Sequence, residues 1–185
     1  MTTEKYQNKY RNASARAQWW DYRTSAPYFV TICTKNREHI FGFVEKGEMH
    51  PNILGEYARK CWNEIPNHFS FIELINFVVM PNHVHGLLKL NSVGSLHATT
   101  PQDQDPQMQK NEFMANISPK TGSLSSVIRS YKSAVTKYAN DNHIPSGWQT
   151  RFYDHIVRNS EECQRIFDYI NNNPKNWEIG KLKGE

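Results

Sequence analysis

The strongest pattern in the chain is Val78-Val79-Met80-Pro81-Asn82-His83-Val84-His85-Gly86, an apolar run that ends in two histidines separated by one aliphatic residue. Side chains alternate across a β-strand, so we expect His83 and His85 to project from one face and Val84 to point into the opposite, apolar layer. Two neighbouring imidazoles can hold a metal ion. The alternative interpretation is a half-buried or solvent-facing pair of histidines.

Strand signals lie on both sides of Pro81-Asn82, a residue pair that can reverse the chain. The apolar residues around it predict a hairpin of two strands, Phe71–Met80 and His83–Leu90. Two more strands are predicted over Tyr28–Thr34 and Trp148–Arg158.

Three segments show the 3.6-residue apolar period of amphipathic helices. The first covers Leu54–Ile65, the second begins at Ser123, and the third begins at Asn159 or Ser160 and stops at Pro174. The order strand, helix, strand, strand, helix, strand, helix predicts an α+β sandwich. This is a ferredoxin-like (RRM-like) layout with helices packed against a mostly antiparallel sheet.

A tyrosine and an amide lie together at the C-terminal end of the third predicted helix. Tyr169 and Asn173 are four residues apart, so they are expected one above the other on one helix face. They flank the predicted buried stripe, which consists of Cys163, Ile166, Phe167 and Ile170. A hydroxyl beside an amide oxygen suits a nucleophile next to a metal ligand. The alternative is a core tyrosine followed by a C-terminal turn residue.

Length and composition limit the classes of protein that fit. The 185 residues suit one domain with a sizeable core, and the net charge of +4 is compatible with a nucleic-acid partner. The 3 cysteines form no Cys-x-x-Cys pair, so they predict neither a disulfide framework nor a zinc knuckle and favour a reducing cytoplasm. No signal peptide is visible, and no stretch approaches the ~20 apolar residues of a membrane span.

Basic side chains indicate where nucleic acid would bind. Residues 1–25 form a predicted N-terminal arm in which Lys and Arg alternate with aromatic residues, a pattern that suits phosphates and unstacked bases. Its Trp19 and Trp20 either contact DNA or pack on the domain. A second candidate DNA-binding set consists of Arg129, Lys132, Lys137, Arg151 and Arg158. Next to this set, His155 either has a structural role, supports the site or faces DNA.

Residues 91–122 differ in composition from the rest of the chain. They are rich in Ser, Thr, Gln, Asp, Asn and Pro and show no apolar period. We interpret them as a flexible insertion within a single domain of residues 26–185. Long loops inside a compact domain are often functional, so the insertion either orders on DNA or is simply tolerated.

Three motifs together resemble a known family. They are His83-Val84-His85 after Met80-Pro81-Asn82, the Trp148–Arg158 segment, and the helix end from Tyr169-Ile170 to Asn173-Pro174. On these residues the chain resembles the single-tyrosine HUH transposases and, more narrowly, the REP-associated tyrosine transposases of bacteria. The resemblance runs from Tyr28 through Trp177 and weakens at both tails and across the insertion.

This resemblance implies a site and a reaction. In that family two histidines and a polar residue four positions after the catalytic tyrosine bind a divalent metal, Mg²⁺ or Mn²⁺. The matching positions are His83, His85 and Asn173 for the metal and Tyr169 for the nucleophile, although related insertion-sequence enzymes often have Gln where this chain has Asn173. The implied reaction is metal-dependent cleavage and rejoining of single-stranded DNA beside a REP-like hairpin, through a 5′-phosphotyrosine intermediate. The resemblance also implies the ferredoxin-like fold and a nucleoid-associated transposase, acting as a monomer or a homodimer.

Two other functions fit the same residues. A non-catalytic module that binds single-stranded nucleic acid would use the basic and aromatic side chains, with Tyr169 in the core. A metal-dependent hydrolase would use activated water in place of the tyrosine. The chain has no Gly-rich phosphate loop, no H-E-x-x-H and no G-x-S-x-G, which argues against nucleotide hydrolases, zincins and serine hydrolases.

Overall fold

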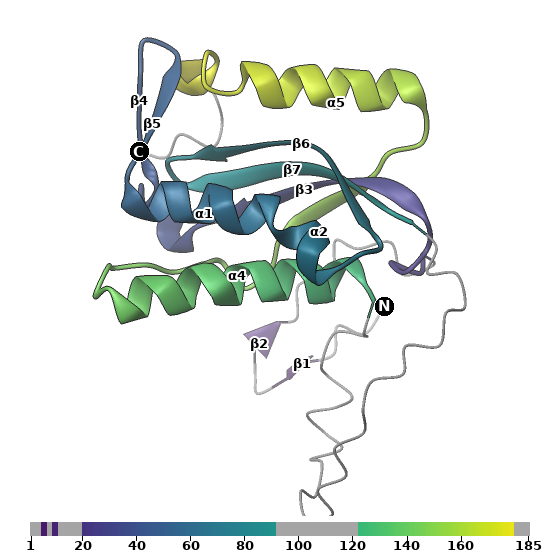
Figure 1. Ribbon diagram of the computed structural model, residues 1–185, viewed down its shortest axis with the longest axis horizontal. Helices are drawn as coiled ribbons and strands as arrows, with labels where there is room; N and C mark the ends of the chain where they lie inside the picture. Colours follow the sequence, from purple (N-terminus) through teal and green to yellow (C-terminus); the bar gives the residue numbers. More distant parts are fainter. Residues whose placement is uncertain (1–4, 7–8, 11–19, 92–121, 180–185) are drawn as a thin grey trace, which may run out of the picture.

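The computed structural model describes residues 5–6, 9–10, 20–91 and 122–179, which form the layers of helices and strands in Figure 1. The main sheet consists of β3 (Ala26–Cys33), β6 (Ile72–Met80), β7 (His83–Leu90) and β8 (Tyr153–Ile156). The helices are α1 (Ile53–Asn63), α2 (Ile65–His68), α4 (Leu124–Asp141) and α5 (Ser160–Asn172). The shorter elements are β1 (Lys5–Tyr6), β2 (Lys9–Tyr10), β4 (Gly42–Glu45), β5 (Glu48–Pro51) and two 3-10 helices, η1 (Lys35–Arg37) and η2 (Trp177–Ile179).

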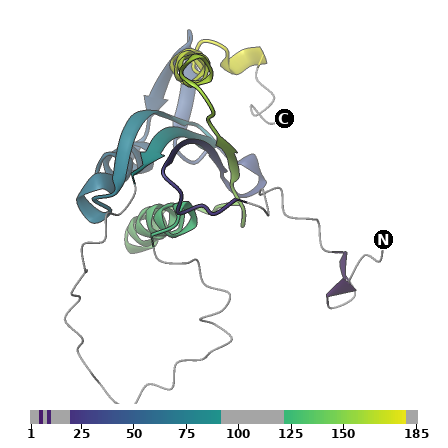
Figure 2. The same cartoon turned by 90° about the vertical axis from the view of Figure 1, so that its right-hand side faces the viewer.

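The main sheet has the strand order β6-β7-β3-β8, and every neighbouring pair is antiparallel. One face of the main sheet is covered by the two long helices α1 and α4. Along the chain, these helices and the four strands occur in the order β3, α1, β6, β7, α4 and β8. This strand order with this connectivity is the ferredoxin-like arrangement, so the predicted α+β fold class is confirmed. The last helix, α5, covers the second face, and Figure 2 shows α5 and α4 on opposite sides of the strands.

The predicted hairpin forms at the middle of the sheet. Met80 pairs with His83 across the Pro81-Asn82 turn, so β6 and β7 lie where the sequence places them. Residues alternate across β7 as expected. Val84 is fully buried in the core beneath α1 and α4, whereas the ring of His85 lies on the other face, within reach of α5.

The larger of two hydrophobic cores lies between the sheet and the helices α1 and α4. α1 begins after Asn52, whose side chain accepts a hydrogen bond from the Gly55 backbone N–H at 2.9 Å. α4 begins after Ser123, whose hydroxyl accepts one from the Ser126 N–H at 3.3 Å. The predicted apolar stripes of both helices enter this core, which includes Leu54, Ala58, Trp62, Leu124, Val127, Ile128, Tyr131 and Val135.

Gly86 allows the indole of Trp62 to lie directly on the sheet. A Cβ atom at position 86 would be 2.0 Å from Trp62 Cζ2, closer than side-chain atoms can approach. The indole also contacts two other rings, Phe77 with centroids 5.9 Å apart and Tyr131 at 5.1 Å. The glycine that follows the His-Val-His motif therefore serves packing on the α1 side of the sheet.

The last strand is shorter than the predicted Trp148–Arg158, because β8 covers only Tyr153–Ile156. Tyr153 pairs with Thr31 of β3, and the next contact upstream is an isolated bridge between Trp148 and Thr34. Between these two pairings the 4 residues 149–152 face the 2 residues 32–33 of β3, so the edge strand bulges outward. The physical reason is that Gln149-Thr150-Arg151 has no apolar residue to alternate into the sheet.

The second, smaller core lies beneath α5. Its fully or nearly fully buried residues are Leu87, Val157 and Ile170. The other members of the predicted stripe, Cys163, Ile166 and Phe167, pack against them but remain partly exposed. The helix begins after Asn159, whose side chain accepts from the Glu162 N–H at 2.8 Å, as one of the two predicted caps.

Some predictions concern the arm and the insertion. Trp19 and residues 92–121 lie outside the described residues. Trp20 packs against the larger core, and its indole N–H donates to the Tyr28 hydroxyl at 2.8 Å, which agrees with the packing alternative. The division into an arm, a domain and an insertion stays a prediction.

None of the described helices is both long enough and apolar enough to cross a membrane.

Candidate active site

Two buried histidines lie at the start of the central strand β7. His83 is 1% exposed and His85 is 2% exposed, and their ring centroids are 4.5 Å apart. The two-residue alternation of the strand thus brings both imidazoles to the face that α5 covers. The solvent-facing alternative for this pair is excluded by the burial.

Each imidazole is held through its Nδ1 atom. Asn82 Nδ2 donates to the Arg37 carbonyl at 3.2 Å, and Asn82 Oδ1 lies 2.8 Å from His83 Nδ1. Because an amide oxygen can only accept, the proton of His83 belongs on Nδ1 and its lone pair on Nε2. His85 Nδ1 lies 2.8 Å from Thr31 Oγ1 on the neighbouring strand. Each ring is thus held by a polar partner at Nδ1, as metal-binding histidines usually are.

Both histidines are kept neutral by their surroundings. Burial lowers the pKa of His83 to about 4, and the neighbouring Asn173 side chain opposes part of that shift. Burial also lowers the pKa of His85 well below its ordinary value, and the proximity of His83 lowers it further. Their ring nitrogens are therefore available as ligands at neutral pH.

The end of α5 brings Tyr169 and Asn173 to the histidines. The Tyr169 hydroxyl lies 3.2 Å from His85 Nε2 although the two residues are 84 positions apart in the chain. Tyr169 remains 47% exposed, so its side chain reaches the surface of the protein. Asn173 is the C-cap of the helix and is 9% exposed, beside His83. The structure therefore brings the four predicted site residues together, and it does not place Tyr169 in the core.

Aromatic side chains surround the histidines. The ring of Phe29 stacks on His85 with centroids 5.2 Å apart and meets the edge of Tyr169 at 6.1 Å. Trp177, in η2, stacks on His83 at 6.0 Å. These rings limit the ways in which the imidazoles can move.

Sequence reasoning did not assign roles to several of these neighbours. Thr31 could have been noticed as a hydroxyl inside an apolar strand, and Asn82 as a polar residue directly before the first histidine. Phe29 carries no such signal, because an aromatic residue within an apolar strand usually belongs to a core. Trp177 lies between Asn176 and Glu178, and nothing in that local pattern points to His83.

The side chains fit a divalent metal ion with nitrogen and oxygen ligands. His83 Nε2 is buried and has no hydrogen-bond partner among the described residues, which is unusual for a polar atom and typical of a ligand position. The described parts of the chain contain no group of three His, Cys, Asp or Glu side chains that could hold a metal. An ion bound by His83 and His85 would therefore take an amide oxygen, that of Asn173, as its third protein ligand.

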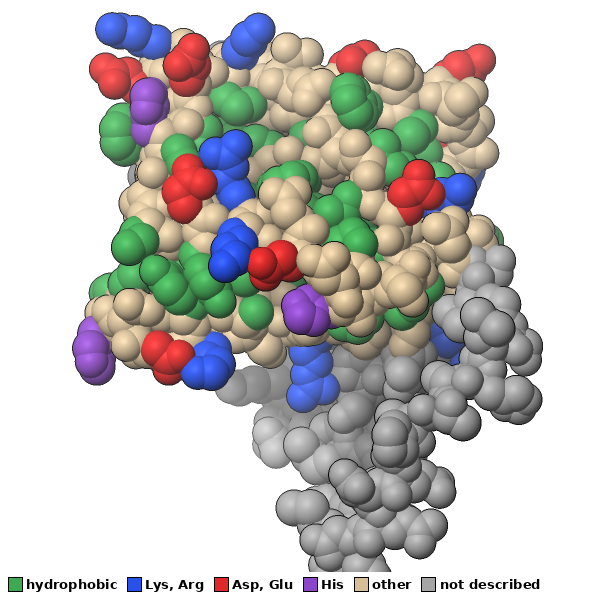
Figure 3. All heavy atoms as spheres, viewed as in Figure 1, with side chains coloured by type: hydrophobic (Ala, Val, Ile, Leu, Met, Phe, Trp, Pro, Cys, Tyr) green, Lys and Arg blue, Asp and Glu red, His purple; other side chains and the backbone are tan. Residues whose placement is uncertain are grey.

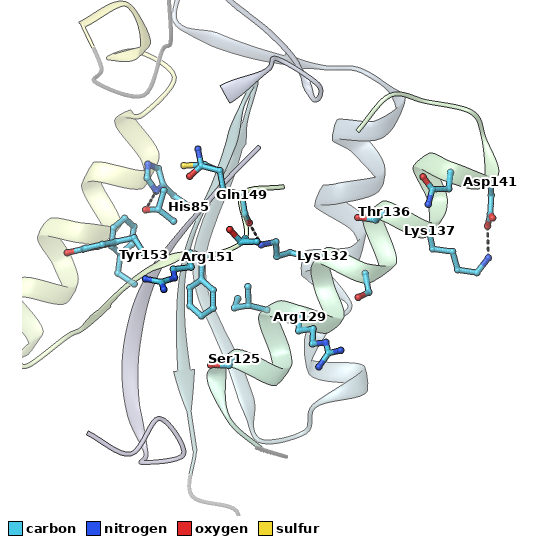
Figure 4. A pocket seen from close by; sticks show the side chains of 18 of the residues that line it. His85, Ser125, Arg129, Lys132, Thr136, Lys137, Asp141, Gln149, Arg151 and Tyr153 are labelled. Atoms are coloured by element: carbon cyan, nitrogen blue, oxygen red, sulfur yellow. Dashed lines mark hydrogen bonds and ion pairs between the residues drawn. The ribbon is translucent and has the colours of Figure 1, made fainter. Parts of the chain in front are cut away.

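A cleft of about 1330 Å³ leads from Tyr169 and His85 along the exposed side of α4. Four of the five predicted basic residues line it, namely Arg129, Lys132, Lys137 and Arg151. Figure 4 shows His85, Arg151 and Tyr153 at one end and the Lys137–Asp141 pair at the other. We call this feature the α4 cleft.

Two residues of the predicted DNA-binding region lie elsewhere. Arg158 is exposed but does not line the α4 cleft, and its backbone N–H donates to Glu162 at 2.8 Å. His155 Nε2 lies 2.8 Å from the same carboxylate, so this histidine links β8 to α5. This contact supports the structural interpretation of His155.

The chain is similar in sequence to two proteins of Haemophilus influenzae. An uncharacterized protein of Haemophilus influenzae is 33% identical over 183 residues, which are 98% of this chain and 98% of that protein. A second Haemophilus influenzae protein, named "Putative REP-associated tyrosine transposase", is 22% identical over 83% of this chain and 73% of its own length. No protein-family model matches the chain.

A solved structure has the same fold. It is that of a REP-associated tyrosine transposase bound to a REP hairpin, with a TM-score of 0.55 and 18% sequence identity. The match covers 90% of this chain and 77% of that chain. At this level of identity the likeness establishes the fold alone.

Proposed function

This chain belongs to the REP-associated tyrosine transposase family, and we propose on that premise that it cleaves and rejoins single-stranded DNA through a covalent bond to Tyr169. Its substrate would carry a hairpin, as the DNA bound by the structural relative does. The observation that carries the proposal is the position of the Tyr169 hydroxyl, 3.2 Å from one of two buried neutral histidines.

The proposed reaction starts at the Tyr169 oxygen. This oxygen attacks the phosphorus of a phosphodiester, the bond from phosphorus to the 3′ oxygen breaks, and the DNA 5′ phosphate remains on the tyrosine. The phenol proton is lost to solvent and the 3′ oxygen takes up a proton, so the leaving strand ends in a 3′-hydroxyl. Attack of a 3′-hydroxyl on the phosphotyrosine reverses these steps and joins the strands.

The chain's own residues would position this reaction. The ring of Phe29 packs against the ring of Tyr169 at an interplanar angle of 84°. The α5 cap at Asn159 fixes the start of the helix that carries the Tyr169 hydroxyl. His83, His85 and Asn173 would hold Mg²⁺ or Mn²⁺, and two imidazole ligands suit Mn²⁺ at least as well as Mg²⁺. When bound, the ion would stabilise the negative charge that develops on the phosphate.

The test is a denaturing-gel assay with hairpin DNA that has single-stranded flanks, labelled at its 3′ end. The 5′-phosphotyrosine link predicts a slowly migrating protein–DNA adduct with Mn²⁺ or Mg²⁺, absent with EDTA. The same DNA labelled at its 5′ end should give only a free, shortened strand. Tyr169→Phe and His83→Ala should abolish the adduct, whereas Tyr57→Phe, on α1 and away from the site, should retain it.

Other outcomes identify the other functions. Binding of every hairpin without an adduct would indicate a non-catalytic single-strand-binding module. Cleavage that persists in Tyr169→Phe would indicate a hydrolase that uses water.

A further inference from the structure

The bulge at residues 149–152 opens the edge of the main sheet next to the proposed site. Where β8 would otherwise continue along β3, the chain leaves the sheet after the Thr34–Trp148 bridge and returns at Tyr153. The side chains of Thr31 and Cys33 of β3 consequently line the α4 cleft. Bulges often occur at sheet edges beside active sites, where they redirect side chains.

The α4 cleft is long enough for several nucleotides. Its lining on α4 extends from Ser125 to Asp141, and a rise of 1.5 Å per residue makes this side about 24 Å long. Tyr169 and His85 line the same cleft, and His85 lies at the end opposite to the Lys137–Asp141 pair (Figure 4). A chain bound along α4 would therefore lead directly to the proposed nucleophile.

The lining of the α4 cleft carries more basic than acidic side chains. Its charged residues other than histidine are four basic side chains and one acid, Asp141. On the face seen in Figure 3, by contrast, Lys and Arg alternate with Asp and Glu over the described residues. The excess of positive charge in the cleft fits a polyanion.

The basic residues differ in how they are engaged. Lys132 Nζ donates to the Gln149 carbonyl at 2.6 Å, so this lysine ties the bulge to α4. Lys137 is paired with Asp141 at 2.6 Å. Arg129 is exposed and forms no ion pair within the described residues, and Arg151 is exposed on the bulge itself. Both arginines are exposed in the cleft, and their planar groups suit phosphates.

An exposed aromatic ring lines the cleft near the proposed nucleophile. Tyr153 is 54% exposed, and its ring meets Phe29 edge-on with centroids 6.5 Å apart. Phe29 in turn stacks on His85. A ring fixed in this way beside a basic cleft can stack on an unpaired base, whereas the bases of a duplex are already stacked on one another.

We propose that the α4 cleft binds the unpaired DNA strand adjoining the scissile phosphate, with Arg129 and Arg151 on its phosphates and Tyr153 stacked on a base. This proposal rests on the proposed function for the identity of the polymer. It assigns to the bulge the role of directing Arg151 and Tyr153 toward the strand.

The test measures binding of a short fluorescein-labelled oligothymidine by fluorescence anisotropy over a series of salt concentrations, with EDTA present so that no metal-dependent cleavage occurs. Arg129→Gln and Arg151→Gln should each weaken binding about tenfold. Each should also reduce the slope of log K against log salt by about 0.7. Tyr153→Ala should weaken binding about tenfold, and Tyr153→Phe should restore it.

Matched controls come from outside the cleft. Arg59→Gln removes an exposed arginine of α1, and Phe43→Ala removes a ring of similar exposure, 57%, on the β4–β5 hairpin. Both should bind as the unaltered protein does. Thermal melting of every variant separates lost binding from lost folding.

The outcomes distinguish this proposal from the proposed function. If the cleft variants bind oligothymidine as the controls do, the cleft proposal is wrong even where the Tyr169-dependent adduct forms. If the cleft variants lose affinity for a blunt-ended duplex but not for oligothymidine, the occupant is duplex DNA and the proposal is again wrong. If the variants lose oligothymidine binding but no adduct forms on any hairpin, the cleft assignment stands and the transposase chemistry fails.

Discussion

The two faces of the main sheet have different compositions and different tasks. The face beneath α1 and α4 holds the larger core, and none of the described histidines is among its buried residues. The smaller core beneath α5 has Leu87, Val157 and Ile170 as its buried members, and His83 and His85 are buried on the same face. Because a strand alternates its side chains, β7 contributes to both at once. One face therefore supplies most of the buried apolar contacts, while the other also holds buried polar side chains.

Lowering the pH should destabilise the protein, because neutral histidines are buried on the face that α5 covers. The pKa of His83 is 6.5 in an unfolded chain and about 4 in the folded, metal-free protein, so only the unfolded chain binds a proton between these values. Through His83 alone, the free energy of unfolding should be constant above pH 6.5 and fall by about 3 kcal/mol as the pH drops to 4. Urea unfolding in EDTA measures this effect. His83→Gln should make the fall with pH shallower, and the remaining fall should come from His85, whose pKa burial also lowers. His143→Gln, in an exposed loop, should leave the profile unchanged.

Gly86→Ala should destabilise the protein by disturbing the larger core beneath α1 and α4. The added Cβ would overlap the Trp62 ring, and overpacking of this kind costs about 2 kcal/mol. Chemical denaturation measures the loss. In a Trp62→Phe background the cost should shrink, because the smaller ring leaves room. An equal cost in both backgrounds would show that the indole is not what makes glycine necessary.

Asn82→Ala should weaken metal binding more than it weakens the fold. Without the amide, His83 Nδ1 loses its acceptor at 2.8 Å, and the ring is no longer fixed with Nε2 as the ligand. Loss of such a partner typically lowers metal affinity about 10- to 100-fold. Calorimetric titration with Mn²⁺ measures it. Asn142→Ala, at the C-terminus of α4, is the matched control, and equal affinities in both variants would contradict the role of Asn82.

Tyr131→Phe should have the smallest effect and the opposite sign. Its hydroxyl is buried in the larger core without a hydrogen-bond partner among the described residues, so removing it should stabilise the protein by up to about 1 kcal/mol. The matched variant is Tyr28→Phe. That hydroxyl accepts from Trp20 and donates to the Thr24 carbonyl, so its loss should destabilise by about 1 kcal/mol. Thermal melts of the pair test the contrast.

Local patterns predicted most of the fold correctly. The hairpin, the helix start at Ser123 and the apolar stripes all follow from periodicity and capping, which depend on residues close in the chain. The last strand was overextended because β8 pairs through only four residues. The polar residues 149–151 give no alternation to support a longer strand, and the bulge over residues 149–152 depends on tertiary contacts.

The sequence by itself determined which side chains share a face: His83 with His85 by strand alternation, and Tyr169 with Asn173 by helical spacing. Only the tertiary structure decided that these two pairs meet, since residues 84 positions apart come together through the docking of α5 on the sheet. It also decided the imidazole partners Asn82 and Thr31, the exposure of Tyr169 and the cleft beside it. The reason is that periodicity records which way a side chain points within its own element, whereas its neighbours are set by strand register and helix packing across the whole chain.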